Sequence, residues 1–433
     1  MTQYGIVLGG GGAKGSYEIG VWKALLELNI QISTIVGTSV GALNGAIMVQ
    51  GDFDIAYRLW TNMDMQSVIN LGGLNLLDHK KLKLKDLIAA AKNFIENKGV
   101  DVTPLKEMLI KYIDETAIRQ SPIDFGLVTF SLSDFKPVTV FKNEIPEGLL
   151  VEYLLASSCL PGFQTLVINS KKFVDGGIYD NIPISLVLKK GIKDIIVVDV
   201  SGIGMVRKVN LKGLNVIYIK NSEPLCGTLQ FEGGVCRDGI TMGYLDALKC
   251  FKVYTGKRYY ITGNSEKSTL SSPLNTKEIS VLDSMLDLKA NSISANKLIN
   301  YPLLRTLYKY AVGRLNSTSI IHAAAEITAE VYGVERLKVY TWEELIEAIL
   351  QAYASVKTSG SSAYNEGLMK NLLRSRGLED LEKLDVKGLA SVNTDFENQD
   401  VNTKMNRKLM AIFIPKVCIA NIFVSLMLWR SRE

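Results

Sequence analysis

The first fifty residues alternate between short apolar runs and longer segments with helical periodicity. Residues 4–8 are a short apolar run that ends at glycine, and residues 32–36 are a second predicted strand that ends at a Gly-Thr-Ser sequence. Residues 17–28 and 40–49 repeat apolar side chains every three or four positions, which is typical of an amphipathic helix. The order strand, loop, helix, strand, turn, helix predicts a parallel sheet with crossover helices.

The same alternation continues to about residue 262. Further strands are predicted at 125–130, 137–141, 172–174, 194–200, 215–219 and 257–261, and further helices at 149–157, 184–189 and 241–251. The segment 195–200 is apolar apart from Asp199 and rich in β-branched residues, as in a strand covered on both faces. We therefore expect an α/β domain over residues 1–262, with a mostly parallel sheet and helices on both faces.

After about residue 262 the pattern becomes helical. Apolar spacing predicts helices at 281–288, 303–314, 319–332 and 342–356, with few strand signals. The segments 357–367 and 390–404 are polar and are predicted to be loop or linker. We expect residues 263–433 to form a mainly α-helical C-terminal domain that ends in a basic, apolar segment.

That terminal segment, residues 409–429, is long enough to cross a bilayer. Pro415 and Lys416 lie near its middle, and a lysine at the centre of a membrane helix costs roughly 2.5–3.5 kcal/mol on insertion scales. These residues favour a helix that contacts a membrane surface or is buried in the protein over a helix that spans the membrane. A basic, apolar helix is attracted to anionic lipid headgroups, and a core helix of the second domain fits its length and hydropathy equally well.

Charge and cysteine content narrow the class of protein. Six of the 49 basic residues and one of the 44 acidic residues lie in 404–433, so the rest of the chain is formally neutral. That distribution argues against a nucleic-acid surface spread over the body. The five cysteines have no CxxC spacing and indicate neither a disulfide framework nor a zinc site, and the N-terminus lacks the features of a secretory signal. We expect an intracellular, cytoplasmic protein.

A glycine-rich loop follows the first strand, in the sequence LGGGGAKGSYEIG (8–20). It matches the dinucleotide fingerprint, but the second predicted strand ends without the acid that would hold a ribose. A P-loop does not fit, because Lys14 precedes Gly15. The backbone N–H groups of Gly10, Gly11 and Gly12 could instead form an oxyanion hole beside the start of a helix. A tight turn without a ligand is the other interpretation.

Ser39 lies in Gly37-Thr38-Ser39-Val40-Gly41, between a predicted strand and a predicted helix. This is the context of a nucleophile elbow, although Ser39 or Thr38 could simply cap the helix. A serine nucleophile needs a base, and neither His79 nor His322 has a local context that suggests catalysis. Asp175 ends a short predicted strand before Gly176-Gly177 and could take the serine proton, whereas an Asp-Gly turn is the alternative. Lys14 could hold an anionic headgroup or the loop, or be a solvated side chain.

These motifs resemble those of the patatin-like phospholipases. The family combines a glycine-rich oxyanion loop ending in a basic residue and glycine, a GxSxG elbow and a DGG or DGA aspartate. Here they correspond to residues 10–15, 37–41 and 175–177, with two weaker features in ASSCLPGF (156–163) and DNIP (180–183). The resemblance covers roughly residues 1–262 and has little to say about residues 263–433.

The resemblance implies a Ser39–Asp175 dyad, an oxyanion hole from Gly10, Gly11 and Gly12, and hydrolysis of fatty acyl esters of phospholipids or related lipids. It implies no metal and no cofactor. A membrane surface is the expected partner, and the oligomeric state is left open. Two alternatives remain at this point: acyl transfer or thioester cleavage by the same dyad, and a lipid-binding scaffold without enzymatic activity.

Overall fold

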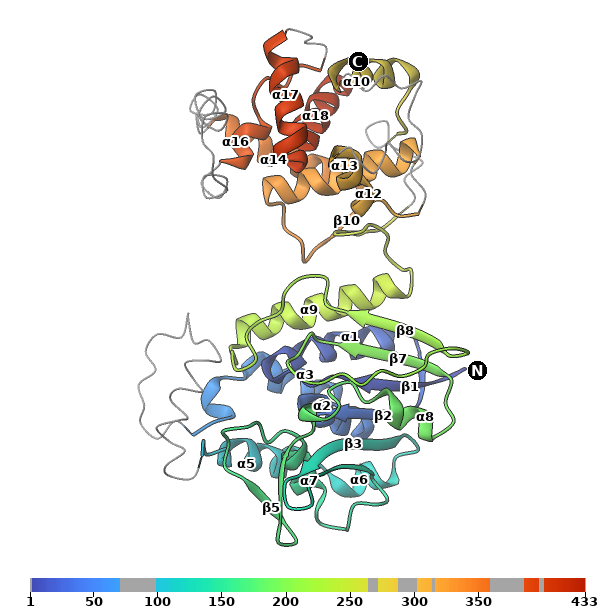
Figure 1. The fold of residues 1–433 in the computed structure, drawn as a ribbon, viewed down its shortest axis with the longest axis vertical. Helices are drawn as coiled ribbons and strands as arrows, with labels where there is room; N and C mark the ends of the chain where they lie inside the picture. The colour runs from blue at the N-terminus through green and yellow to red at the C-terminus, as the bar shows by residue number, and fades with distance from the viewer. Residues whose placement is uncertain are drawn as a thin grey trace. The chain divides into compact units, whose positions relative to one another are not determined.

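The computed structural model describes residues 2–70, 99–263, 272–286, 302–313, 316–358, 385–396 and 401–432. His79 and most of the predicted loop 357–367 lie outside these ranges. The chain divides into two compact units, which we call unit 1 (Met1–Lys252) and unit 2 (Val253–Glu433). Each unit is described by itself (Figure 1).

Unit 1 is built on a mixed sheet in the order β5-β6-β3-β2-β1-β7-β8, with β4 paired to β3. Its parallel strands are β1 (Gln3–Leu8), β2 (Gln31–Thr38), β3 (Asp124–Ser131), β7 (Asp194–Asp199) and β8 (Asn215–Lys220). The antiparallel strands are β4 (Lys136–Phe141), β5 (Leu166–Ile168) and β6 (Lys171–Asp175). Figure 1 shows β8, β7, β1, β2 and β3 side by side.

Helices cover both faces of this sheet because successive strand side chains point to opposite sides. Val7, Val36 and Val197 face α8 (Ile184–Lys189) and form one core with it. Leu8, Ile35 and Phe125 lie under α2 (Val40–Gln50) on the other face. The remaining helices near the sheet are α1 (Ser16–Glu27), α7 (Leu150–Ser157) and α9 (Gly233–Cys250), with α1 packed along α9. The expected fold class is confirmed.

Some short helices of unit 1 were not predicted by periodicity. These are α3 (Phe53–Asn62), α5 (Thr103–Tyr112), α6 (Glu115–Gln120) and the 3-10 turns η1 (Gly12–Gly15), η2 (Met65–Ser67) and η3 (Gly176–Ile178). Helix α9 also begins at Gly233, well before the expected start at 241. Its first turn is rich in glycine and charge, so the sequence there carries no apolar stripe.

Unit 2 is mainly helical. Its helices are α10 (Thr276–Leu286), α12 (Pro302–Tyr310), α13 (Ser317–Tyr332), α14 (Trp342–Thr358), α16 (Val386–Ala390), α17 (Val401–Phe413) and α18 (Pro415–Arg430). Strands β9 (Tyr260–Ile261) and β10 (Val339–Tyr340) form a short parallel pair. The strand expected at 257–261 therefore pairs within unit 2, and part of the loop expected at 390–404 is the start of α17.

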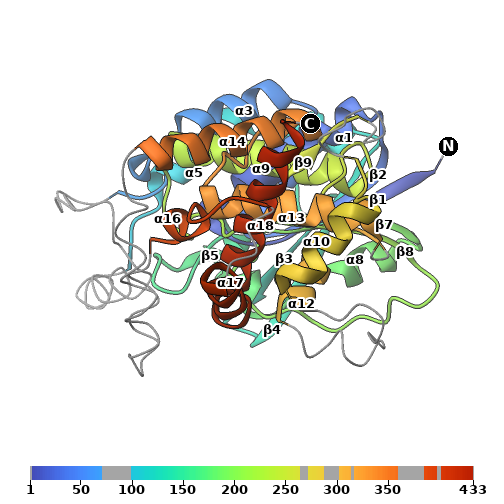
Figure 2. The ribbon, with the colours of Figure 1, turned by 90° about the horizontal axis from the view of Figure 1, so that it is seen from above.

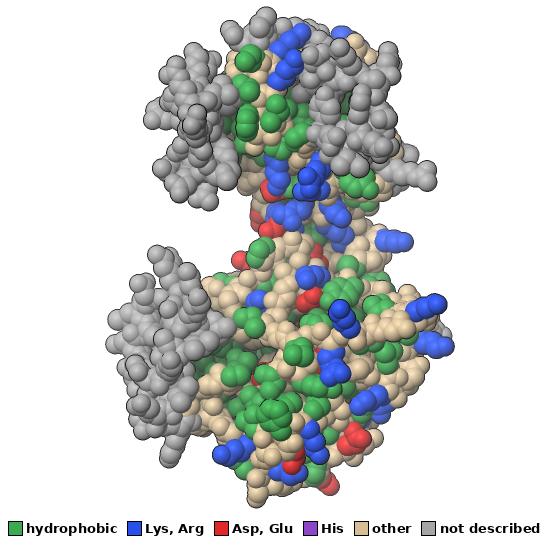
Figure 3. All heavy atoms as spheres, viewed as in Figure 1, with side chains coloured by type: hydrophobic (Ala, Val, Ile, Leu, Met, Phe, Trp, Pro, Cys, Tyr) green, Lys and Arg blue, Asp and Glu red, His purple; other side chains and the backbone are tan. Residues whose placement is uncertain are grey.

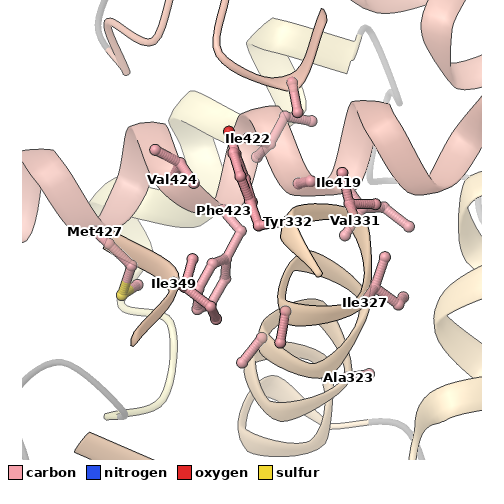
Figure 4. Close-up of a cluster of buried hydrophobic side chains, with 14 of the residues drawn as sticks. Ala323, Ile327, Val331, Tyr332, Ile349, Ile419, Ile422, Phe423, Val424 and Met427 are labelled. Atoms are coloured by element: carbon pink, nitrogen blue, oxygen red, sulfur yellow. The ribbon is translucent and has the colours of Figure 1, made fainter. Parts of the chain in front are cut away.

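Helix α18 lies in the core of unit 2. It packs against α13, α14, α16 and α17, and both ribbon views show it among them (Figures 1 and 2). All residues from Val417 to Met427 are buried. Phe423, Ile422 and Met427 join Ile327, Ile349 and other apolar side chains in one cluster (Figure 4). Of the two expectations for residues 409–429, the structure supports the core helix for Val417 to Met427.

The apolar segment 409–429 is also not one continuous helix. Helix α17 ends at Phe413 and α18 begins at Pro415, because proline cannot donate the backbone hydrogen bond that would continue the first helix. Among the described residues, no helix is both long enough and apolar enough to cross a membrane.

Candidate active site

Ser39 lies on a sharp turn between β2 and α2. Its backbone has φ 55° and ψ −129°, a conformation that costs a non-glycine residue roughly 1–3 kcal/mol. The turn needs glycine on both sides. A Cβ atom on Gly37 would lie 2.3 Å from the carbonyl of Gly41, and one on Gly41 would lie 2.5 Å from the carbonyl oxygen of Leu8. The GxSxG spacing is therefore a steric requirement of this strained turn.

Two buried hydroxyl groups hold the turn in place. The backbone N–H of Ser39 donates to Oγ of Ser157 at 2.9 Å, and Ser157 Oγ donates to the carbonyl of Val128 at 2.7 Å. The hydroxyl of Thr38 donates to the carbonyl of Asp180 at 2.8 Å. These bonds offset the backbone strain and fix the position of the Ser39 backbone, from which its side chain projects.

Strand β3 brings Asp175 next to Ser39. Val128 of β3 pairs with Thr38, where β2 ends, and the following residue, Thr129, pairs with Asp175, where β6 ends. Strands β2 and β6 thus meet end to end along the same edge of β3. A Cβ atom on Gly176 would lie 3.1 Å from the methyl group of Thr38, which shows how closely the two chain segments approach.

Asp175 is almost fully buried, with 3% of its surface exposed. Its Oδ1 atom accepts the N–H of Gly177 at 2.7 Å. Burial raises the pKa of Asp175 from 3.8 to about 6, and the Ser39 hydroxyl and the Gly177 N–H partly offset that rise. Oδ2 has no aligned hydrogen-bond partner among the described residues. The Ser39 hydroxyl is a near neighbour of the carboxyl group, since it is one of the groups that lower the pKa of Asp175.

The glycine loop differs from expectation at Gly10. The N–H of Gly10 donates to the carbonyl of Asn181 at 3.1 Å, and the Asn181 side chain donates to the carbonyl of Gly10 at 3.0 Å. Gly10 is thus clamped, and its N–H is not free for an oxyanion. Among the described residues, no backbone carbonyl accepts the N–H of Gly11 or Gly12. Lys14 donates from Nζ to the carbonyl of Ser201 at 2.7 Å, so in this structure it ties down the loop.

Two apolar cavities of unit 1 open beside these residues. One lies next to Ser39, has about 780 Å³ of empty space with its opening to solvent included, and is lined by residues such as Ile47, Trp60 and Leu109. The other, next to Asp175, has about 1180 Å³ counted in the same way. Leu160, Phe163 and Leu229 line both. Sequence reasoning missed Trp60 and Leu109, because it did not predict α3 and α5, the helices that carry them.

A buried acid, Glu18, hydrogen-bonds to Asn44, a residue that lines the first cavity. Glu18 of α1 accepts from the side-chain amide of Asn44 at 2.7 Å, and Asn44 accepts from the indole N–H of Trp60 at 3.0 Å. Complete burial raises the pKa of Glu18 to about 8, partly offset by the bond from Asn44. This acid was not singled out from the sequence, since nothing in an ordinary helical stretch distinguishes it.

The described residues also include features that do not join Ser39. His322 lies in unit 2, stacked on Trp342 with ring centroids 3.7 Å apart, and burial lowers its pKa to about 4. In the described ranges, no group of three His, Cys, Asp or Glu side chains could hold a metal ion. The cysteines Cys159, Cys226, Cys236, Cys250 and Cys418 are free thiols.

The segment that contains the glycine loop, the strained serine and the DGG aspartate matches a known family. The family model described as patatin-like phospholipase aligns with residues 6–188. This segment is a patatin-like phospholipase domain. The match begins in β1 and ends in α8, and it includes both Ser39 and Asp175.

Curated relatives resemble the same part of the chain. Lysophospholipase NTE1 of Kluyveromyces lactis is 28% identical over 211 residues, covering 46% of this chain and 13% of that protein. Patatin-like phospholipase domain-containing protein 7 of Rattus norvegicus is 25% identical over 202 residues, covering 45% of this chain and 13% of that protein. The chain thus matches only a small part of the length of these relatives.

Among solved structures, VipD from Legionella pneumophila aligns over 99% of this chain and 92% of its own. The sequence identity is 14% and the TM-score is 0.38. A similarity this low carries no conclusion about function. The patatin-like assignment rests on the family model and on the curated relatives.

Proposed function

We propose that the chain is a serine lipid acyl hydrolase of the phospholipase A type, with Ser39 as nucleophile and Asp175 as base. The observation that carries the proposal is the pairing of β2 and β6 with successive residues of β3, which makes a strained serine and a buried carboxyl group neighbours. We assign the activity to the first domain, expected over residues 1–262.

In this mechanism the Ser39 hydroxyl attacks the ester carbonyl while Asp175 accepts its proton. The N–H groups of Gly11 and Gly12, together with that of Val40 at the start of α2, are the proposed donors to the tetrahedral oxyanion. A single donor of this kind is worth roughly 3–4 kcal/mol in enzymes where one has been removed. Asp175 then protonates the leaving alcohol and activates a water molecule, which releases the fatty acid and restores Ser39.

The apolar lining of the two cavities supports a lipid substrate. Side chains such as Leu43, Ile47 and Leu109 would favour an acyl chain beside Ser39. The relatives named lysophospholipase and patatin-like phospholipase agree with an acyl ester of a phospholipid. We propose no cofactor for this reaction, because the described side chains and backbone groups supply each proton transfer and the oxyanion donors.

Covalent labelling with a fluorophosphonate probe tests the nucleophile and the base. The wild-type protein is expected to be labelled, whereas Ser39→Ala and Asp175→Asn are expected to lose the label. Ser158→Ala is the matched control, because Ser158 lines the same cavity as Ser39 and is not assigned a catalytic role. Labelling of Ser39→Ala, or loss of labelling in Ser158→Ala alone, would overturn the assignment of the nucleophile.

Product analysis then separates hydrolysis from its alternatives. Free fatty acid formed from a phospholipid supports the hydrolase. Acyl transfer to an added alcohol in preference to water would make the protein an acyltransferase. Lipid binding without either product would make it a scaffold.

A further inference from the structure

The connection between β7 and β8 exposes apolar side chains at the mouth of the proposed active site. The two strands are parallel, so residues 200–214 start at the sheet edge that holds Ser39 and return to the opposite edge. Ile203, Met205 and Val206 are 67%, 59% and 53% exposed. Ile203 and Met205 also line the cavity that contains Asp175. Exposed apolar side chains gathered in one place on a surface indicate an interaction site.

The backbone of this connection is fixed directly to the site. Met205 donates its N–H to the carbonyl of Gly177 at 2.8 Å and accepts the N–H of Asn181 at 2.6 Å. A Cβ atom on Gly202 would lie 1.8 Å from the carbonyl oxygen of Gly10, so only glycine fits there. The exposed side chains are therefore carried by a backbone that hydrogen-bonds to the DGG segment and contacts the glycine loop.

Basic residues follow the apolar ones immediately. Arg207 and Lys208 are exposed, and the segment 200–214 contains no acidic residue. The guanidinium group of Arg207 lies over the ring of Tyr179 at 4.4 Å, which holds one of these charges next to the DGG turn. Apolar side chains flanked by cations match the boundary between acyl chains and anionic headgroups in a bilayer.

We propose that residues 203–208 dock the protein on an anionic lipid bilayer, with Ile203, Met205 and Val206 entering the headgroup region and Arg207 and Lys208 pairing with lipid phosphates or carboxylates. Figure 3 shows one face of unit 1, on which hydrophobic side chains gather and lysine, arginine and some acidic side chains lie around them. Docking in this way would present the cavity beside Asp175 to the lipid surface. The inference rests on the proposed function, because it assigns the substrate to a membrane.

The test measures binding of the full chain to vesicles, in a Ser39→Ala background so that no lipid is consumed. The probes are vesicles of phosphatidylcholine alone and of phosphatidylcholine mixed with phosphatidylserine. Tighter binding to the mixed vesicles is expected. The double substitution Val206→Ser with Lys208→Gln is expected to weaken that binding about tenfold, since it removes one apolar contact and one charge near the surface.

The same connection offers a matched control. Leu211 and Lys212 are exposed but lie near the start of β8, at the opposite edge of the sheet. Leu211→Ser with Lys212→Gln removes the same chemistry and should leave vesicle binding unchanged. Equal binding of the two double variants, or equal binding of the wild type to both kinds of vesicle, would overturn the proposal, and a protein partner would then be the better occupant of this surface.

Hydrolysis of a soluble short-chain ester separates this inference from the proposed function. With Ser39 present, the Val206→Ser, Lys208→Gln variant should cleave the soluble ester as the wild type does. Intact soluble activity with no vesicle preference would refute the docking surface and leave the hydrolase. Vesicle binding that follows the prediction, without cleavage of any ester by the wild type, would support the surface and refute the hydrolase.

Discussion

The buried polar groups around Ser39 in unit 1 and those along α18 in unit 2 differ in how completely they are hydrogen-bonded. Asn421, at the middle of α18, donates to the carbonyls of Ala390 and Val392 at 3.1 and 2.6 Å and accepts from Arg407 at 3.1 Å. At the end of the same helix, Arg430 pairs with Glu278 at 2.7 Å. Burial of these groups is compensated by partners, as folding stability requires.

Around Ser39, the cost of burying polar groups is less completely offset by hydrogen bonds. Ser39 holds a positive φ angle, and Asp175 keeps one carboxylate oxygen without an aligned partner in the described part of the chain. Incomplete pairing and strain cost stability, and both occur where a hydroxyl and a carboxyl group adjoin an apolar cavity. At the candidate site, backbone strain, an incompletely paired carboxyl group and an apolar cavity therefore occur together.

The largest expected effect is on catalysis. Ser39→Ala should lower kcat/KM for an ester by roughly 10³-fold or more, because no acyl-enzyme can form. The measurement is hydrolysis of a soluble ester by purified protein. The stability of unit 1 should be the same in the variant and in the wild type, since the substitution removes no hydrogen bond on which the turn depends. An active Ser39→Ala protein would refute the contrast drawn above.

The largest expected effect on stability lies in unit 2. Asn421→Leu should lower the free energy of unfolding by about 3 kcal/mol, because it leaves two buried carbonyls and a guanidinium without that partner. Urea denaturation followed by circular dichroism measures it. Ser425→Ala is the control, since its hydroxyl bonds only within α18, to the carbonyl of Asn421, and should cost about 1 kcal/mol. Equal losses in the two variants would mean that Asn421 is not a central partner.

The pH dependence of hydrolysis should report the ionisation of Asp175. Asp175 must be ionised to accept the Ser39 proton, and its pKa is raised to about 6. Activity should therefore rise through pH 6 and fall about tenfold for each pH unit well below it. The profile of kcat/KM with a soluble, non-ionising ester measures this. An inflection at the ordinary carboxyl pKa, or none, would contradict the role assigned to burial.

The buried Glu18 should make the folding stability of unit 1 depend on pH. Its pKa is raised to about 8 in the folded protein, above the ordinary value of 4.5, so folding favours its protonated form. The stabilisation is complete below about pH 4.5 and is lost as pH rises toward 8, with a slope of up to about 1.4 kcal/mol per pH unit. Glu18→Gln should flatten this part of the stability curve. Glu27→Gln, at an exposed position of the same helix, should leave the slope unchanged.

The smallest expected effect concerns Lys14. Its bond to the carbonyl of Ser201 is exposed, so Lys14→Met should lower kcat/KM only about two- to fivefold by loosening the glycine loop. The loss should be equal for neutral and anionic esters of the same chain length. A loss confined to anionic esters would assign Lys14 to headgroup binding instead.

Local sequence patterns predicted the fold and the position of the serine turn because these depend on neighbouring residues. The strand, the GxSxG turn and α2 lie within twenty residues, and Gly37 and Gly41 are explained by contacts in that stretch and with β1. The apolar periodicity of 409–429 could not reveal its burial in unit 2. Lys416, which argued against a membrane span, pairs with Glu330, and Asn421 bonds to residues near α16; both partners lie far away in the chain.

The clamp on Gly10 was missed for the same reason. Asn181 is its partner, and only the folded sheet brings the two together. Helices α3 and α5 do carry local signals, an apolar face in α3 and a proline in the first turn of α5, but only the folded chain brings them to the cavity beside Ser39. Contacts between distant segments therefore account for most of what the pattern did not predict.

The end-to-end meeting of β2 and β6 along β3 has a consequence for how such a domain tolerates changes in length. The spacing of Ser39 and Asp175, the proposed reacting groups, is set by the pairing of their strands with Val128 and Thr129 and not by the loops and helices that separate them in the chain. Insertions between α2 and β3, or between β4 and β6, should leave that spacing intact. Deleting a single residue inside β3 would turn every following side chain to the other face and dismantle it.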